Sequence, residues 1–178
     1  DECFALLLSR NADLAIVYSL PGSDMFSGDY LEMIDFWSDR LIPVLHPAMA
    51  QDLLAGTAIS ELAYIAYPQE VFFGMIVAER VLPALGPDIL ALPRAETALT
   101  MAALEMAAAG FAVAWVPETL ARPGIAQGRI ADLSPVLPSC PLSVRAVRLK
   151  GARGPAEEVI WNHILALRQG GLADFVGA

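Results

Sequence analysis

The sequence RAETALTMAALEMAAAGFAVAWVPE, residues 94–118, decides the fold of this chain. Residues 97–109 are almost all strong helix formers, and their apolar positions recur at intervals of three and four, which predicts an amphipathic helix. Gly110 then supplies the residue type that most readily takes the left-handed conformation at a helix end. Residues 111–116 are apolar throughout, as in a strand covered on both faces. The stretch therefore predicts half of a β-α-β unit.

The rest of the chain continues this alternation of helices and strands. Runs with strand character occupy residues 14–18, 31–37, 40–45, 63–67, 89–92, 130–133 and 142–149. Helical patterns occupy residues 3–10, 59–62, 72–85 and 155–169, and the last helix is expected to bury Val159, Ile160, Ile164 and Leu167. Such alternation is typical of a largely parallel α/β sheet.

Length and composition indicate a folded protein outside the membrane. With 178 residues the chain can bury a sizeable core, as one domain or two small lobes. Its hydrophobic content is 56% and only 17% of residues are charged, which argues against disorder. No apolar run reaches the about 18 residues of a membrane helix. Without a signal-peptide pattern, and with only Cys3 and Cys140 as cysteines, the sequence predicts a cytoplasmic location.

The charge balance argues against nucleic-acid binding by this part of the protein. The chain has 20 acidic and 11 basic residues and a formal net charge of −9. Binding to a phosphate backbone needs clustered Lys and Arg. Any contact with DNA is therefore expected from another segment.

The sequence offers few groups for catalysis or metal binding. His46 and His163 are its only histidines, and neither has a cysteine or carboxylate at metal-ligand or triad-like spacing. Cys140, after a serine, lacks the glycines of a nucleophile elbow. We therefore predict no enzymatic activity, no metal and no cofactor.

Four segments, in this order, resemble the effector-binding domain of LysR-type transcriptional regulators. Residues 13–16, DLAI, resemble the end of the family's G-x-x-D-x-A-I pattern, with Asn11 where glycine is usual, and LIPVLHP at 41–47 resembles a compressed L-V-x-V-x-x-x-x-H-P. AAAGFAVAWVPE at 107–118 resembles V-A-A-G-x-G-V-A-L-L-P-E, and QGRI at 127–130 resembles x-G-x-L-V. The central segment is the most specific of the four.

The resemblance implies an α/β fold of two Rossmann-like lobes with a cleft between them, similar to type 2 periplasmic binding proteins. Lobe I would comprise residues 1–63 plus 142–178 and lobe II residues 64–141. Such a regulator also has an N-terminal winged helix-turn-helix, a linker helix, and an opening strand, helix and strand of the effector domain. None of these has a counterpart in the chain, so lobe I is expected to be N-terminally incomplete.

Matched positions in the family imply a ligand site in the cleft. Its expected residues are Tyr18, Ser19, Pro68, Gln69, Glu70, Phe72, Glu96, Thr97, Trp115, Val116 and Pro117. In open α/β sheets, ligands bind outside the carboxyl ends of the strands, where these residues fall.

The residues of this site leave several alternatives open. The N-terminus of the central helix can hold a carboxylate, but Thr97 can instead cap that helix and satisfy its N–H groups. Glu96, if it faces the cleft, favours a ligand with a hydroxyl or amine. Gln69 and Glu70 form either pocket or hydrated turn, and Trp115 forms either a pocket wall or core packing.

The expected function is a ligand-sensing regulatory domain of a LysR-type regulator. The resemblance implies a small polar effector, a homodimer or homotetramer, and DNA binding through the absent N-terminal region. Two alternatives share the fold: an exported solute-binding protein of a transporter, which a signal sequence would favour, and an enzyme, against which the scarcity of acid–base groups argues.

Overall fold

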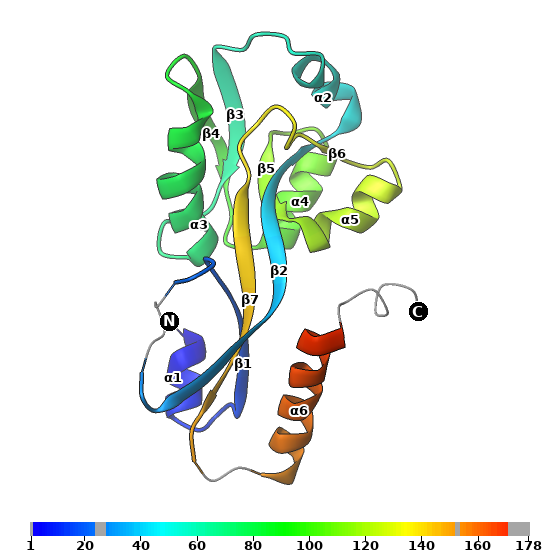
Figure 1. The fold of residues 1–178 in the computed structure, drawn as a ribbon. Helices are drawn as coiled ribbons and strands as arrows, with labels where there is room; N and C mark the ends of the chain where they lie inside the picture. The colour runs from blue at the N-terminus through cyan, green and yellow to red at the C-terminus, as the bar shows by residue number, and fades with distance from the viewer. Residues whose placement is uncertain (1, 24–27, 152–153, 171–178) are drawn as a thin grey trace. The chain divides into compact units, whose positions relative to one another are not determined.

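A computed structural model describes the chain over residues 2–23, 28–151 and 154–170 (Figure 1). The chain divides into two compact units, unit 1 with Asp1–Asp39 and Pro141–Ala178, and unit 2 with Arg40–Cys140. Residues 40–63, which the sequence-based division places in lobe I, thus pack with unit 2. The second boundary lies near residue 141 in both divisions.

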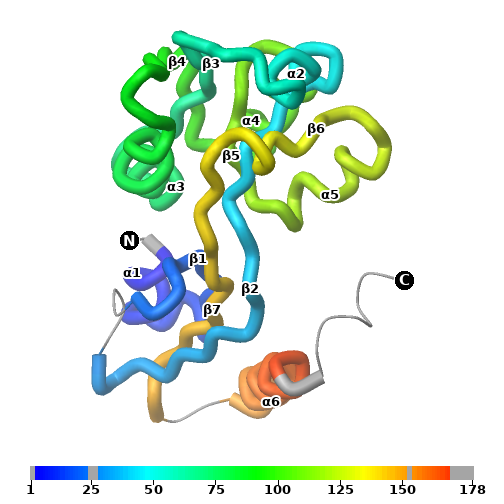
Figure 2. Tube along the Cα trace, turned by 45° about the horizontal axis from the view of Figure 1, so that its top comes forward, coloured from blue at the N-terminus to red at the C-terminus, as the bar shows by residue number. Residues whose placement is uncertain are grey.

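Unit 1 is built from strands between two helices. Its elements are α1 (Glu2–Leu8), β1 (Leu14–Ser19), the first part of β2 (Leu31–Leu45), β7 (Cys140–Leu149) and α6 (Pro155–Gly170). β1 pairs antiparallel with β7, which in turn neighbours β2. Figures 1 and 2 show α1 and α6 on opposite sides of these strands.

The two faces of β7 explain the two cores of unit 1. Successive residues of a strand point to opposite faces. Ala146 accordingly packs with Trp161 and Ile164 of α6, while Val147 packs with Leu7 of α1. Each helix therefore has its own hydrophobic cluster on its own face of the sheet.

The prediction for the buried face of the last helix is wrong in part. Ile164 is buried as expected, but Val159 and Ile160 are 70% and 51% exposed. Trp161, which is 1% exposed, takes the central position against the sheet. Because a helix turns about 100° per residue, this placement rotates the two neighbouring aliphatic residues off the sheet.

Unit 2 combines a small parallel sheet with antiparallel pairs. β3 (Glu61–Ala66) pairs parallel with β4 (Leu90–Glu96), and β5 (Ala114–Pro117) and β6 (Ala131–Asp132) both pair antiparallel with β2. Its helices are α2 (Pro47–Leu54), α3 (Phe72–Ile76), α4 (Thr100–Ala108) and α5 (Glu118–Ala126). A π-helical turn (Val77–Val81) and a 3-10 turn (Leu82–Leu85) extend α3.

The central stretch has the predicted order of helix, glycine and strand, but both elements are shorter than predicted. The helix covers Thr100–Ala108 instead of residues 97–109, and the strand covers Ala114–Pro117 instead of residues 111–116, which leaves Phe111 46% exposed before it. α4 ends at Ala108; Gly110 follows the C-cap Ala109 with a φ of +78°, and the Phe111 N–H donates to the Met106 carbonyl at 3.0 Å. These are the features of a Schellman motif. All four residues of β5 are buried, as expected for a covered strand.

Three predictions of local structure are wrong. Residues 31–45 form one strand, and the helix expected at 59–62 instead occupies Pro47–Leu54, where proline suits the first turn and the His46 Nδ1 accepts from the Ala48 N–H at 3.2 Å. The sheet is also not largely parallel. Among the described strands, parallel pairing joins β3 to β4 and, by a single bridge, Tyr64 to Val113.

The turn between α1 and β1 departs from the expected glycine position. Arg10 has a φ of +55°, and it is the only non-glycine residue in the described chain with a positive φ. Counting back from Asp13, Arg10 and not Asn11 occupies the glycine of the G-x-x-D pattern. The left-handed conformation there explains why glycine is the favoured residue.

Within the described residues, no helix combines the length and apolar composition that crossing a bilayer requires.

Candidate functional site

Three segments predicted to line the ligand site meet in unit 2. The chain leaves β3 at Tyr67 and Pro68, leaves β4 at Thr97, and passes through β5 at Trp115. The Thr97 N–H donates to the Ala66 carbonyl at 3.0 Å, and the Tyr67 hydroxyl donates to the Trp115 carbonyl at 2.9 Å. These hydrogen bonds hold the ends of β3 and β4 and the strand β5 together.

The N-terminus of α4 carries no side-chain cap. Its N-cap residue is Leu99, and the Thr97 hydroxyl accepts instead from the Leu99 N–H at 3.1 Å. Of the two alternatives left open for this helix end, the one with Thr97 as N-cap is therefore wrong, because the helix begins at Thr100 and Thr97 closes the turn before it. An uncapped helix N-terminus keeps free N–H donors and the positive end of the helix dipole, which together attract anions.

Tyr67 and Thr100 lie beside this helix end, although the sequence analysis did not select them. Tyr67 is 4% exposed, and burial raises the pKa of its phenol well above the ordinary value of 10.0, a rise that a hydrogen bond with Thr100 opposes. The phenol is therefore neutral at physiological pH. Two sequence features could have identified these residues as part of the site. Tyr67 directly precedes Pro68 at a strand end, and Thr100 follows Thr97 by three residues, which is about one helical turn.

The turn that precedes α3 is close to the same strand end. Pro68 and Phe72 are half-buried, whereas Gln69 and Glu70 are exposed. Phe72 packs on Phe73 with ring centroids 5.6 Å apart, and Phe73 lies 5.9 Å from Tyr67. The turn thus places polar side chains next to a row of aromatic rings.

The remaining predicted residues of unit 2 differ in exposure. Glu96 is exposed at the end of β4 and Thr97 is half-buried, but Trp115, Val116 and Pro117 are buried. The Trp115 indole N–H donates to the Pro138 carbonyl at 2.8 Å, and its ring meets Tyr64 edge to face at 6.3 Å. The structure thus has Trp115 in the core, and its contact with a ligand stays a prediction.

Tyr18 and Ser19, the two predicted residues in unit 1, both hydrogen-bond within that unit. The Tyr18 hydroxyl donates to Asp39 Oδ2 at 3.1 Å, and burial, together with the charge of Asp39, raises the pKa of the phenol. The hydroxyl of the buried Ser19 donates to the Ser143 carbonyl at 3.4 Å. Their part in a ligand site also stays a prediction.

Metal ligation finds no support in the described residues. Nowhere in that part of the chain do three His, Cys, Asp or Glu side chains come close enough to hold a metal ion. His46 serves as the N-cap of α2, and His163 is exposed on α6.

Solved structures share this fold. VV2_1132, a LysR family transcriptional regulator, is 24% identical over 90% of this chain and 53% of its own, with a TM-score of 0.72. The apo regulatory domain of HypT from Salmonella typhimurium is 18% identical over 95% of this chain and 78% of its own, with a TM-score of 0.77. Full-length LysG from Corynebacterium glutamicum, with bound effector Arg, is 13% identical over 93% and 54%, with a TM-score of 0.64.

The share of each relative that the chain covers shows that it matches one domain of the full-length regulators. The chain spans about half the length of VV2_1132 and of LysG, but 78% of the HypT regulatory domain. No curated protein sequence matches the chain. The mixed α/β fold is that of the type 2 periplasmic-binding-protein-like effector domains, as the sequence predicted.

The sequence profile of the LysR substrate binding domain matches residues 1–169. Because that match covers nearly the whole chain, the chain belongs to the LysR substrate binding domain family, the regulatory effector-binding domain of LysR-type transcriptional regulators.

Proposed function

We propose that this domain binds a small polar effector, with a carboxylate, at the N-terminus of α4 in unit 2. The observation that carries the proposal is the uncapped end of that helix beside the neutral Tyr67 phenol and the Thr100 hydroxyl. Helix N-termini without side-chain caps are ready-made anion sites.

The surroundings favour an effector that also carries a hydroxyl or an ammonium group. Glu96 is exposed at the end of β4, one residue before Thr97, and a carboxylate there would repel a purely anionic ligand. In LysG the bound effector is Arg, a molecule with both a carboxylate and cationic groups. An amino acid or a hydroxy acid fits this combination.

Effector binding would act on DNA through the rest of the regulator. A ligand that binds one conformation of the domain more tightly shifts the population toward that conformation. The DNA-binding region, an N-terminal winged helix-turn-helix in the family, lies outside this chain. We propose that the complete protein is a cytoplasmic homodimer or homotetramer whose arrangement on DNA responds to this shift. The cleft predicted between the two lobes, with Tyr18 and Ser19, belongs to the same proposal.

A thermal-shift screen of the domain with amino acids, hydroxy acids and aromatic acids tests the site. A ligand at about 100 times its dissociation constant adds roughly 2.7 kcal/mol to the free energy of unfolding. The hit should lose most of its effect in Thr100→Val and a smaller part in Tyr67→Phe, because the Tyr67 hydroxyl donates its single proton to the Trp115 carbonyl and acts on the ligand only through its hydrogen bond with Thr100.

Thr57→Val is the matched control, because Thr57 is exposed in the loop between α2 and β3 and is not among the residues of the proposed site. Hits that persist in both site variants, or that are indifferent to removal of the ligand's carboxylate, would overturn the proposed site.

A further inference from the structure

A second polar cavity lies entirely within unit 1. It measures about 200 Å³ and lies between the α1–β1 turn, the end of β7 and the start of α6. Two cations, Arg10 and Lys150, and two carboxylates, Asp13 and Glu157, line it. None of these residues belongs to the site proposed at α4.

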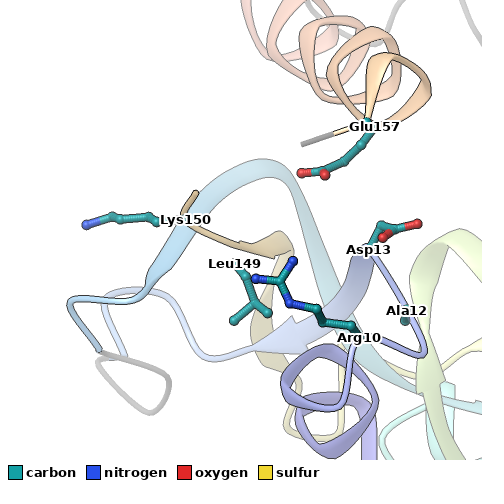
Figure 3. Close-up of a pocket in the computed structure, with 7 residues that line it drawn as sticks. Arg10, Ala12, Asp13, Leu149, Lys150 and Glu157 are labelled. Carbon is teal, nitrogen blue, oxygen red and sulfur yellow. The ribbon is translucent and has the colours of Figure 1, made fainter. Parts of the chain in front are cut away.

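Arg10 reaches this cavity from a strained position. Its φ of +55° is a conformation that costs free energy for any residue other than glycine. Figure 3 shows its guanidinium and the Glu157 carboxylate extending toward the same space from different elements, while Lys150 extends away from them. Within the described residues the Arg10 guanidinium has neither a hydrogen bond nor an ion pair. Strained backbone conformations cluster at binding sites, so a strained residue whose charged group has no hydrogen bond or ion pair suggests a role in ligand binding.

Glu157 brings an incompletely satisfied carboxylate to the same cavity. Its Oε1 is buried and has no hydrogen-bond partner among the described residues, and the same holds for Nη1 of Arg148. These two atoms are 3.6 Å apart, so the buried Oε1 faces Arg148 and forms an ion pair with it, although the distance is too long for a strong charge-assisted hydrogen bond. Arg148 is instead held by Glu32, with Nε and Nη2 at 3.1 and 3.0 Å from Oε2, and by its stacking on Trp161. The Glu157 carboxylate also lines the cavity, where a ligand ammonium would be its second partner beside Arg148.

We propose that this cavity binds a small zwitterionic amino acid. Its carboxylate would accept from the Arg10 guanidinium, which is suited to bidentate binding, and its ammonium would donate to Glu157. The two charged groups that extend toward the same space, the Arg10 guanidinium and the Glu157 carboxylate, have opposite signs, so the cavity favours a ligand that carries both signs over a simple anion or cation. Such a site in unit 1 would let the domain respond to a second metabolite.

Isothermal titration calorimetry of the 178-residue chain tests this with glycine, L-alanine and L-serine. Propionate and ethylamine are the matched single-charge probes, because propionate is L-alanine without its ammonium group and ethylamine is L-alanine without its carboxylate. We expect heat of binding with at least one amino acid, and affinity weaker by about tenfold or more for both single-charge probes, because each loses one charge-assisted hydrogen bond.

Two substitutions place the ligand in the cavity. Arg10→Gly removes the guanidinium and relieves the backbone strain, so binding should fall by about tenfold or more while the melting temperature rises. Glu157→Gln should weaken binding similarly, whereas Glu158→Gln, its neighbour on α6 that does not line the cavity, should not. Thr100→Val should leave this binding intact, which separates the cavity from the effector site.

Three results would overturn the proposal. The first is the absence of binding by all three amino acids, as expected if Arg10 and Glu157 simply pair with each other in solution. The second is equal affinity for propionate or ethylamine. The third is unchanged binding in both Arg10→Gly and Glu157→Gln.

Discussion

At the scale of single residues, the conformation of Arg10 predicts a stabilising substitution. A left-handed conformation costs an L-residue with a Cβ about 1 kcal/mol, and Arg10 has a φ of +55°. Arg10→Gly should therefore raise the free energy of unfolding by about 1 kcal/mol, measured by urea denaturation. Asn11→Gly is the control, because Asn11 has no positive φ and should gain nothing. The opposite ranking of the two variants would place the glycine position at Asn11.

Tyr67 predicts a dependence of stability on alkaline pH. Burial raises the pKa of its phenol above the ordinary 10.0, so the unfolded chain releases this proton at a lower pH than the folded chain. The free energy of unfolding should thus be unaffected below pH 10 and fall above it. Tyr67→Phe should cost about 1 kcal/mol at neutral pH, because the hydrogen bond to the Trp115 carbonyl is lost.

The same variant should lose stability less steeply above pH 10. Burial also raises the pKa values of Tyr18 and Tyr64, so part of the slope remains. Urea denaturation at several pH values measures the slope. An identical slope in Tyr67→Phe and the unsubstituted chain would contradict the assignment.

At the scale of secondary-structure elements, the start of α3 depends on a glycine without a side chain. A Cβ at Gly74 would lie 1.9 Å from the Pro68 carbonyl oxygen, which is backbone and cannot move aside alone. Gly74→Ala should cost about 3 kcal/mol or more and disturb the turn at the α4 site. Gly124→Ala, in α5, is the matched helical control, because its Cβ would meet only the end of the Ile130 side chain at 3.1 Å. A melting temperature that falls equally in both variants would count against the close approach.

The buried face of α6 makes a second prediction at this scale. Trp161 is 1% exposed and stacks on Arg148, whose guanidinium carbon lies 3.9 Å from the ring centroid. Trp161→Ala should cost about 3 to 5 kcal/mol, while Val159→Ala, at a 70% exposed position, should change the free energy of unfolding little. A large decrease in the free energy of unfolding in Val159→Ala would contradict this prediction and would instead support the buried face with Val159 that the sequence predicted.

At the scale of the whole molecule, the chain should not bind DNA by itself. Its net charge of −9 repels a phosphate backbone, and the DNA-binding region of the family lies outside it. Fluorescence anisotropy with a labelled duplex should show no binding at physiological salt, whereas the complete regulator should bind. Salt-dependent binding by the 178-residue chain would instead locate a DNA contact in this domain.

The fold class follows from patterns that are local in the chain. A helix within residues 97–109, the stop at Gly110 and a strand after it follow from helix propensity, the conformational freedom of glycine and apolar continuity, although the helix in the structure is shorter, Thr100–Ala108. The order of the four family-like segments then led to the LysR family, which the profile match confirms. The selected positions included Pro68 and Thr97, which lie at strand ends in unit 2.

The sequence by itself determined the family, the fold class and the positions of most helices and strands, because these depend on residues close together in the chain. Tertiary structure decided strand direction, the start of α4 at Thr100 and the burial of Trp115, because each depends on contacts between distant segments. It also decided that Arg10 and Glu157, which are far apart in the chain, line one cavity once β1, β7 and α6 have packed. Helix and strand propensities depend on residues that are close in the chain, so they cannot predict which distant residues line the same cavity.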